Sequence, residues 1–460
     1  MAPRFGRALD NVMIAAGLIG AVVMVAALAG ILSRPLGHAA VFWPANPLLL
    51  GLMLRDPRLA RPGCWPAAFV GYVAADLMTG GTWGPTLWAS AANLAGCLTG
   101  YALFARVHAR DRDLRQLGSF MQMLVAGAAA AGVAAAIAVF VAPPLFGLHG
   151  LDGWFRWFCG ELLNYQTVLP VVLTFPALGR WRRRRRQPRA MHLDWRLGLP
   201  ALALAAALAA GTLVGGPGVL GFAVPALLWC GLTYRQFTTA LLTLGFAMWT
   251  ILTLAAGWIG MSIGGDLVHN LTSAFLGIAL VSLMPVTVAS VTRTRNDLMR
   301  RLERAATRDF LTDALNRSAF TIAGKRLLAH EPVTALILDL DRFKQVNDTH
   351  GHATGDKVLQ GFARVVERNL RDDDVFGRIG GEEFAVLLRC GPDEAAAVAE
   401  RIRTAFAAER VTTDDGRVVQ ATVSIGLAAG PDDLDTLLAR ADEALYRAKA
   451  EGRDRVVRAA

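Results

Sequence analysis

Residues 375–389 read VFGRIGGEEFAVLLR. Two short apolar runs flank the pair Gly380–Gly381, an arrangement typical of a β-hairpin with a tight turn. Glycine permits the positive φ that such a turn needs, and its missing side chain lets a substrate approach the backbone. Two carboxylates, Glu382 and Glu383, follow the turn directly. We therefore expect a hairpin that presents acidic groups at its tip.

Helices and strands alternate on both sides of this hairpin. An apolar run at 333–338 is typical of a buried strand and leads into Asp339. The other expected elements are helices at 317–330, 354–370, 392–409 and 434–450, and strands at 375–379, 384–389, 418–428 and 454–458. The pattern predicts an α+β domain in which helices back an antiparallel sheet.

Charged residues stand at the ends of these elements. If the two strands pair side by side, Asp339 and Glu382 converge, and carboxylate oxygens are the ligands that magnesium prefers beside phosphate oxygens. Lys449 and Arg453 lie one helical turn apart near the end of the last helix, where they would neutralise a triphosphate. Any one of these charges alone fits a solvated surface. Together they point to metal-assisted nucleotidyl transfer.

Four separated motifs resemble the GGDEF family of diguanylate cyclases over residues 305–460. They are GGEEF at 380–384, RDFLTDALNR at 308–317, LDLDRFKQVNDTHGHATGDKVL at 338–359, and ADEALYRAK at 441–449 followed by Gly452-Arg453. Ala314 stands where the family usually has Gly, and Asp454 where Asn is commoner. The resemblance implies a palm-like domain, similar to nucleotidyl cyclases, that condenses two GTP molecules into cyclic di-GMP and two pyrophosphates.

The resemblance also implies roles for single residues. Two magnesium ions, or manganese in their place, would be held by Asp339, Glu382 and the backbone carbonyl of Leu340. Glu383 would assist removal of the ribose 3′-hydroxyl proton, so the implied catalytic residues are Glu383, Glu382 and Asp339. The implied substrate-binding residues are Arg342, Phe343, Lys344, Gly380 and Gly381 at the phosphates, Asn347, His352 and Asp356 at guanine and ribose, and Lys449 and Arg453 at the triphosphate.

One such domain binds one GTP, whereas the product requires two. A homodimer would bring two domains face to face and raise their effective concentration. Arg371 and Asp374 form an RxxD element, which in the family is an inhibitory site for the product. The alternative for this pair is an ordinary charged loop. A catalytically inactive receptor for GTP or cyclic di-GMP is the alternative for the whole domain.

The sequence before about residue 290 is of a different kind. Hydrophobic residues make up 54% of the chain and charged residues only 18%, and the apolar excess lies in this part. Apolar stretches occur at 11–32, 84–105, 120–142, 197–214, 238–258 and 267–291, with weaker ones at 39–54, 64–79, 154–178 and 218–234. Arginines gather in alternate loops, including RWRRRRRQPR at 180–189.

This alternation is typical of a membrane protein with arginines on the cytoplasmic side. It predicts about eight to ten spans in a bacterial inner membrane, in contact with lipid, with both termini cytoplasmic. The same distribution explains the net charge of +10 without nucleic acid as a partner. The expected domains are 1–290 in the membrane, a linker helix at 291–308 and the cyclase-like domain at 309–460. The linker places Val291, Leu298, Leu302 and Ala305 in an apolar seam suited to a coiled coil, and the alternative is a single amphipathic helix.

The stretch FWPAN at 42–46, with the helices that follow, resembles the MASE1 family of bacterial membrane sensors. Asp76, Glu161 and Asn164 fall inside expected spans and would line a ligand cavity, because polar groups at such depth are costly and often functional. The alternative is that they lie near helix ends, at headgroups or against a neighbouring helix.

Overall fold

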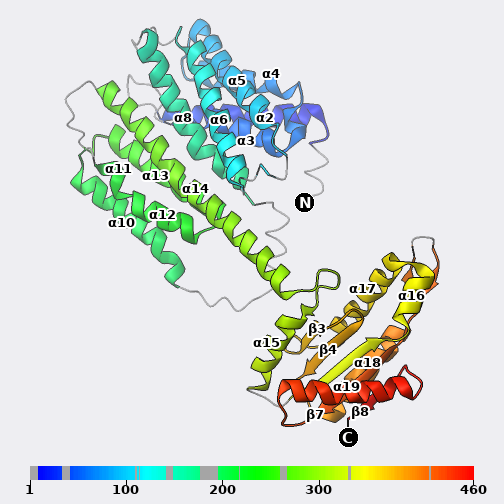
Figure 1. Ribbon diagram of the computed structural model, residues 1–460. Coiled ribbons are helices and arrows are strands. Elements are labelled where there is room, and N and C mark those ends of the chain that lie inside the picture. The colour runs from blue at the N-terminus through cyan, green and yellow to red at the C-terminus, as the bar shows by residue number, and fades with distance from the viewer. Residues whose placement is uncertain are drawn as a thin grey trace. The chain divides into compact units, whose positions relative to one another are not determined.

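The computed structural model divides the chain into two compact units, Met1–Asn296 and Asp297–Ala460 (Figure 1). The residues it describes are 9–33, 42–108, 111–112, 114, 116–140, 149–176, 195–216, 218–259, 267–329, 333–413 and 416–459. Several charges used to predict the membrane topology lie outside the described residues, namely Arg4, Arg7, Arg34, Arg110, Arg115, Asp266 and the cluster at 180–189.

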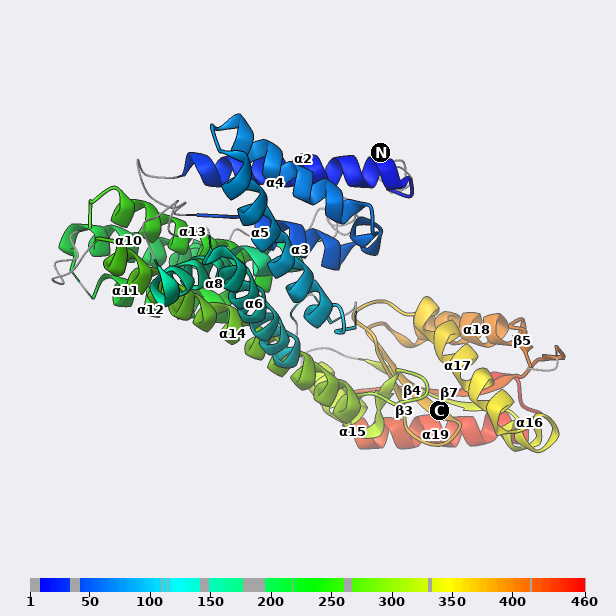
Figure 2. The ribbon, with the colours of Figure 1, turned by 90° about the horizontal axis from the view of Figure 1, so that it is seen from above.

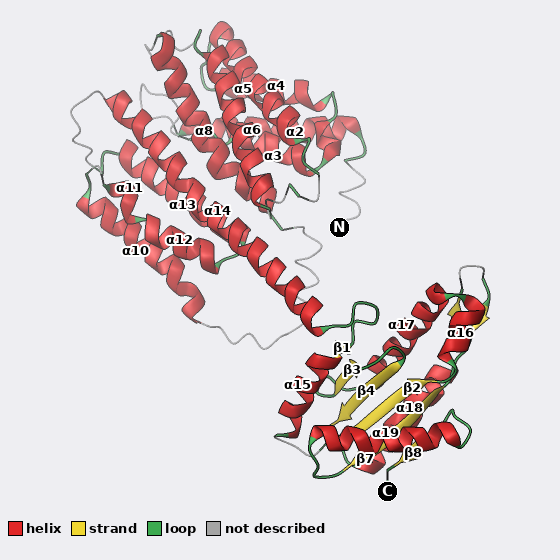
Figure 3. Ribbon diagram, viewed as in Figure 1, coloured by secondary structure: helices red, strands yellow, loops and turns green. Residues whose placement is uncertain are grey.

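The described part of the N-terminal unit is helical (Figure 3). Its helices are α2 (Val12–Leu32), α3 (Ala45–Arg55), α4 (Cys64–Met78), α5 (Trp83–Phe104), α6 (Leu117–Ala138), α8 (Gly150–Thr174), α10 (Leu199–Val214), α11 (Val219–Phe222), α12 (Val224–Thr233), α13 (Gln236–Ala255) and α14 (Leu267–Thr307). By length and composition, five helical segments in the described residues could cross a membrane: Val12–Leu32, Leu117–Ala138, Trp195–Val214, Gln236–Ala255 and Asn270–Thr307.

Two of the weaker expected spans are shorter than predicted. The stretch at 39–54 contains α3, which has only 11 residues, about half of what a hydrocarbon core requires. The stretch at 218–234 is divided at Ala223 into α11 and α12. Pro225 explains this break, because a proline fits the first turn of a helix but not its interior.

The expected linker helix is the second half of α14. This helix has 41 residues and continues past Pro285 without interruption. Val291, Leu298 and Leu302 are 45%, 54% and 63% exposed. These residues are the apolar positions from which a coiled-coil seam was predicted, and within a single chain they remain largely uncovered.

The C-terminal unit contains a six-stranded sheet of order β1-β3-β4-β2-β7-β8. The strands are β1 (Leu315–Asn316), β2 (Thr334–Leu340), β3 (Val375–Arg378), β4 (Glu383–Leu388), β7 (Val423–Ala429) and β8 (Val456–Arg458). The prediction of an antiparallel sheet holds for the four central strands, but β1 pairs parallel with β3, and β8 parallel with β7. Helix α19 (Leu434–Ala450) connects β7 to β8, and a helical crossover of this kind returns the chain in the same direction.

Helices cover both faces of this sheet (Figure 2). Leu336, Leu338 and Leu340 pack in one core with α17 (His352–Asn369) and α18 (Pro392–Ala407). Ala335 and Ile337 pack in a second core with α15 (Arg317–Leu328) and α19. Because side chains alternate along a strand, Asp339 belongs to the face that carries α19.

Several elements differ from the predicted pattern. The expected strand 418–428 is interrupted, with β6 (Val418–Val419) paired to β5 (Val411–Thr412) in a separate hairpin before β7 begins. Helix α16 (Phe343–His350) was not predicted, because its eight residues include only two apolar side chains, those of Phe343 and Val346. It follows β2 after only two residues, and so lies next to the carboxylate at the end of that strand.

Candidate functional site

The carboxylates predicted to converge lie at one end of the sheet. Asp339 of β2 pairs in register with Glu383 of β4, and the amide of Leu340 donates to the Glu382 carbonyl at 3.4 Å. Asp339 is 4% exposed, whereas Glu382 is half-buried and Glu383 is exposed. The pairing of β2 with β4 therefore brings three acidic groups from two strands to one edge.

Lys449 of α19 supplies the opposite charge. Its Nζ lies 2.8 Å from Oδ2 of Asp339, because Asp339 and α19 share one face of the sheet. Burial raises the pKa of Asp339; Lys449 opposes that rise, and Glu383 and Asp341 add to it. Burial also raises the pKa of Glu382, and the charge of Asp339 adds to the rise. A bound cation would relieve this mutual repulsion.

The Gly380–Gly381 turn has the predicted position but not the predicted backbone. Neither glycine has a positive φ, so the expectation that this turn needs one is wrong. Instead, a Cβ at Gly380 would overlap the side chain of Glu383, whereas one at Gly381 would meet open space. A side chain at position 380 would therefore displace the exposed end of Glu383, whereas Gly381 leaves room beside the turn.

An ion pair that sequence reasoning missed holds this turn. Arg378 Nη1 lies 2.9 Å from Oδ1 of Asp309, with 13% and 16% of the two side chains exposed. Arg378 also donates to the Gly381 carbonyl. Thr312 donates to the same Asp309 oxygen through its amide at 3.0 Å and its hydroxyl at 2.7 Å. Both residues lie in quoted stretches of sequence, but no signal in the sequence pairs two side chains that are 69 positions apart.

The residues expected at the nucleotide lie at the start of the next two helices. Arg342 has a φ of 53° and precedes α16, so that the amides of its first turn, including those of Phe343 and Lys344, are free of helical partners. Asn347 is half-buried against Gly355. His352 and Asp356 are exposed in the first turn and a half of α17. A helix N-terminus is a common phosphate site.

Asp341 has a structural role. It is 7% exposed and accepts hydrogen bonds at 2.7 Å from the hydroxyls of Thr422 and Ser424. The amide of Asp454 donates to it at 3.1 Å. Asp341 therefore fixes the loop that carries Arg453, the second predicted triphosphate ligand. Arg453 itself is exposed.

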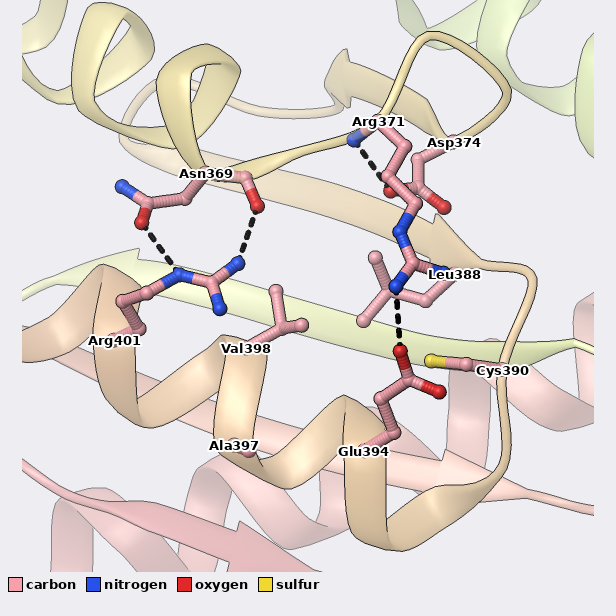
Figure 4. A pocket seen from close by; sticks show the side chains of 9 residues that line it. All are labelled: Asn369, Arg371, Asp374, Leu388, Cys390, Glu394, Ala397, Val398 and Arg401. Carbon is pink, nitrogen blue, oxygen red and sulfur yellow. Dashed lines mark hydrogen bonds and ion pairs between the residues drawn. The ribbon is translucent and has the colours of Figure 1, made fainter.

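Arg371 and Asp374 border a pocket (Figure 4). The Arg371 amide donates to Asp374 at 2.8 Å, and its guanidinium pairs with Glu394 at 2.8 Å, with 73% and 52% of the two side chains exposed. A second guanidinium, that of Arg401, donates to Asn369 on the other side of the pocket. The pocket thus holds two arginines on neighbouring elements.

The predicted polar residues of the N-terminal unit meet the FWPAN motif. Asn46 Nδ2 donates to Asn93 at 3.0 Å and to Glu161 at 2.9 Å, while Tyr72 donates to Asn46 Oδ1 at 2.6 Å. The Trp43 amide donates to Asn164 at 3.0 Å. Glu161 lies in the middle of α8, not at its end. These contacts join α3, α4, α5 and α8.

Asp76, in contrast, lies near the C-terminal end of α4. It accepts a short hydrogen bond from the Thr86 hydroxyl. Of the two alternatives predicted for these polar residues, the helix-end position therefore applies to Asp76.

Comparisons with known proteins cover both units. The family model described as "Diguanylate cyclase, GGDEF domain" matches residues 306–455. The probable diguanylate cyclase DgcF of Escherichia coli O157:H7 is 31% identical over 444 residues, which are 92% of this chain and 90% of that protein. Its counterpart in strain K12 is 34% identical over 310 residues, 65% of this chain and 95% of that protein.

Among solved structures, the coiled coil and GGDEF domain of DgcB from Caulobacter crescentus, in complex with c-di-GMP, is 34% identical. It covers 37% of this chain and 94% of that chain, with a TM-score of 0.36.

Proposed function

The chain belongs to the GGDEF family and is a diguanylate cyclase; from this premise we propose that residues 309–460 join two GTP molecules into cyclic di-GMP at the edge formed by β2 and β4. The observation that carries the proposal is the register pair Asp339–Glu383, with Glu382 beside it and Lys449 2.8 Å from Asp339. Acids from two strands and a cation from a helix suit a metal-bound triphosphate.

We propose that Asp339, Glu382 and the backbone carbonyl of Leu340 hold magnesium, or manganese in its place. The donor set fits such an ion, because all three groups supply oxygen and burial disfavours the clustered negative charge of Asp339 and Glu382. Within the described residues, no three His, Cys, Asp or Glu side chains form a metal-binding group, so part of the shell would come from backbone and phosphate oxygens. When bound, the metal would activate the attacking oxygen and stabilise the pyrophosphate leaving group.

The protein's own groups orient the nucleotide. Amides of Arg342, Phe343 and Lys344 would bind phosphate oxygens at the start of α16. Asn347 and Asp356 would read the guanine edge, with His352 beside the base or ribose. A carboxylate at Asp356 accepts from the ring N–H and the amino group of guanine, a pair of donors that adenine does not offer.

Transfer would then require three further side chains. Glu383 would accept the proton of the ribose 3′-hydroxyl, since it is exposed at the turn and lies opposite Asp339. Lys449 and Arg453 would stabilise charge on the triphosphate. Each protomer of a homodimer would supply one nucleophile and one α-phosphate to its partner.

We propose that the N-terminal unit is an integral membrane sensor of the MASE1 type with about eight to ten spans and cytoplasmic termini. The polar contacts of Asn46 support this proposal, because they make the FWPAN motif the centre of a network that joins four helices. The exposed seam on α14 supports dimerisation through the linker. A change of register there would alter how the two cyclase domains face each other.

We propose that the Arg371 pocket binds cyclic di-GMP as an inhibitor. Exposed ion pairs contribute little stability, so Arg371 can exchange Glu394 for a phosphate at small cost. Arg401 on α18 would provide a second cation. In the structure it donates to the neutral side chain of Asn369. Bidentate contacts from guanidinium groups suit both phosphate and the guanine edge.

The test uses the full chain in nanodiscs, incubated with GTP and magnesium, and identifies the nucleotide formed by chromatography. We expect cyclic di-GMP and pyrophosphate, and loss of turnover in Glu382→Gln, which keeps the shape of the side chain and removes its charge. Asp393→Asn serves as the matched control, because this carboxylate is 92% exposed and lies away from the site. GTP binding without pyrophosphate release would instead indicate an inactive receptor, and full activity of Glu382→Gln would refute the metal assignment.

A further inference from the structure

The loop between α19 and β8 carries Arg453 in an unusual backbone. Gly452, Arg453 and Asp454 have φ angles of 117°, 66° and 45°. Side-chain-bearing residues rarely adopt such angles, and aspartate and asparagine tolerate them better than most. Two consecutive residues of this kind persist only where their surroundings hold them. The position of Arg453 therefore depends on what fixes the loop.

Two contacts fix Asp454, the residue after Arg453. Its amide donates to the buried carboxylate of Asp341 at 3.1 Å. Its own carboxylate pairs with Nη1 of Arg403 on α18 at 2.7 Å. The first contact anchors the loop to the end of β2, and the second anchors it to a helix on the other face of the sheet.

Arg403 is oriented by a second ion pair, which lies within α18. Glu400, one turn earlier on α18, accepts from Arg403 Nε at 3.0 Å through both carboxylate oxygens. This clamp leaves Nη1 directed at Asp454, and only 19% of the Arg403 side chain is exposed. A guanidinium already fixed on its helix loses little further freedom when it binds a second carboxylate.

We propose that Arg403 is a positioning residue for the cyclase reaction: through its ion pair with Asp454 it holds the loop in the conformation in which Arg453 meets the triphosphate of GTP. This inference rests on the proposed role of Arg453. An asparagine at position 454 could adopt the same backbone but could not form this ion pair.

The test compares Arg403→Gln, Arg453→Ala and the double variant in the full chain in nanodiscs, measuring KM for GTP and kcat. We expect Arg403→Gln to raise KM about five-fold, as befits one partly exposed ion pair, with kcat within about two-fold of the wild type. In the Arg453→Ala background, Arg403→Gln should have no additional effect on KM, because Arg403 acts only through Arg453.

Arg458→Gln is the matched control. It removes the 2.7 Å ion pair of Arg458 with Asp393, which also joins α18 to the C-terminal segment but at the other end of the helix, and KM should not change. Asp454→Asn breaks the Arg403 pair from the other side and should reproduce the effect of Arg403→Gln, which covers the case in which one variant fails to fold.

The outcomes separate the inference from the function on which it rests. Equal increases of KM by Arg403→Gln with and without Arg453 would overturn the positioning role, as would an unchanged KM in Arg403→Gln beside a raised KM in Arg453→Ala. An unchanged KM in Arg453→Ala would overturn the proposed triphosphate contact itself.

Discussion

Replacement of Asp309 by alanine should loosen the hairpin that carries the acidic groups. Asp309 Oδ1 accepts from Arg378 Nη1 at 2.9 Å and from both polar groups of Thr312. Arg378 in turn donates to the carbonyl of Gly381 and lies over the ring of Phe384 at 5.9 Å. Without Asp309, a guanidinium that is 13% exposed keeps its place at the turn but loses its counter-charge.

The expected loss of stability in Asp309→Ala follows from the burial of the ion pair. Removal of one partner from a fully buried pair costs about 3–5 kcal/mol, and an exposed pair contributes about 0–1 kcal/mol. With 13% and 16% of the side chains exposed, and with the Gly381 contact retained, we expect about 2 kcal/mol of local stability to be lost. At 1.4 kcal/mol per factor of ten, that is an approximately thirty-fold increase in the opening of the hairpin.

Hydrogen exchange followed by mass spectrometry measures this opening. The chain's 11 tryptophans all precede residue 259, so tryptophan fluorescence does not report on the cyclase unit. The amides of Ile379 and Gly380 donate to the Glu383 carbonyl at 2.9 and 3.2 Å, and a peptide over 375–384 contains both. Exchange there should accelerate in Asp309→Ala and not in Asp393→Ala. Equal exchange in the Asp309 variant and the wild type would refute the clamp.

Three further predictions concern neighbouring groups. Arg371→Ala should keep turnover and lose inhibition by added cyclic di-GMP, measured as initial rates against product concentration. Gly380→Ala should lower kcat at least ten-fold, since the added methyl displaces the Glu383 carboxylate, whereas Gly391→Ala, which faces open space before α18, should retain most activity. Burial raises the pKa of Asp309, but its hydrogen bonds outweigh burial and hold the pKa below its usual value. Its stabilisation is therefore complete above a pH of about 4 and fades as the pH falls through the lower folded pKa, and Asp309→Asn should lack this acid-dependent loss of thermal stability.

The sequence predicted those parts of the structure that follow from local pattern. Apolar runs located β2, β3 and β4, and helical periodicity located α15, α17, α18 and α19 within a few residues. The predicted strand ends placed Asp339 and Glu382 at one edge, because pairing of the two strands brings the end of one beside the start of the other. The parallel pairing of the two edge strands was not predicted. β1 and β8 have only two and three residues, and their strand partners depend on the course of the chain between them.

Contacts between distant segments could not be predicted in the same way. The Asp309–Arg378 and Arg403–Asp454 pairs span 69 and 51 positions, and nothing in residue type distinguishes these arginines from many others. The turn conformation was inferred from glycine alone, which permits a positive φ without requiring it. What the structure adds is that the Glu383 side chain lies against Gly380, and this contact cannot be inferred from residue type.

The position of Asp339 depends on the alternation of side chains between the two faces of the sheet along β2. Leu338 and Leu340 belong to the core under α17 and α18, which leaves Asp339 on the α19 face, where Lys449 reaches it at 2.8 Å. A shift of one residue would bury the carboxylate among the aromatic rings of the other core and turn a leucine toward the lysine. The apolar pattern that folds the sheet therefore also selects which face bears the negative charge. The proposed metal site and the fold depend on the same alternation, so the acidic edge cannot be displaced without the loss of the core.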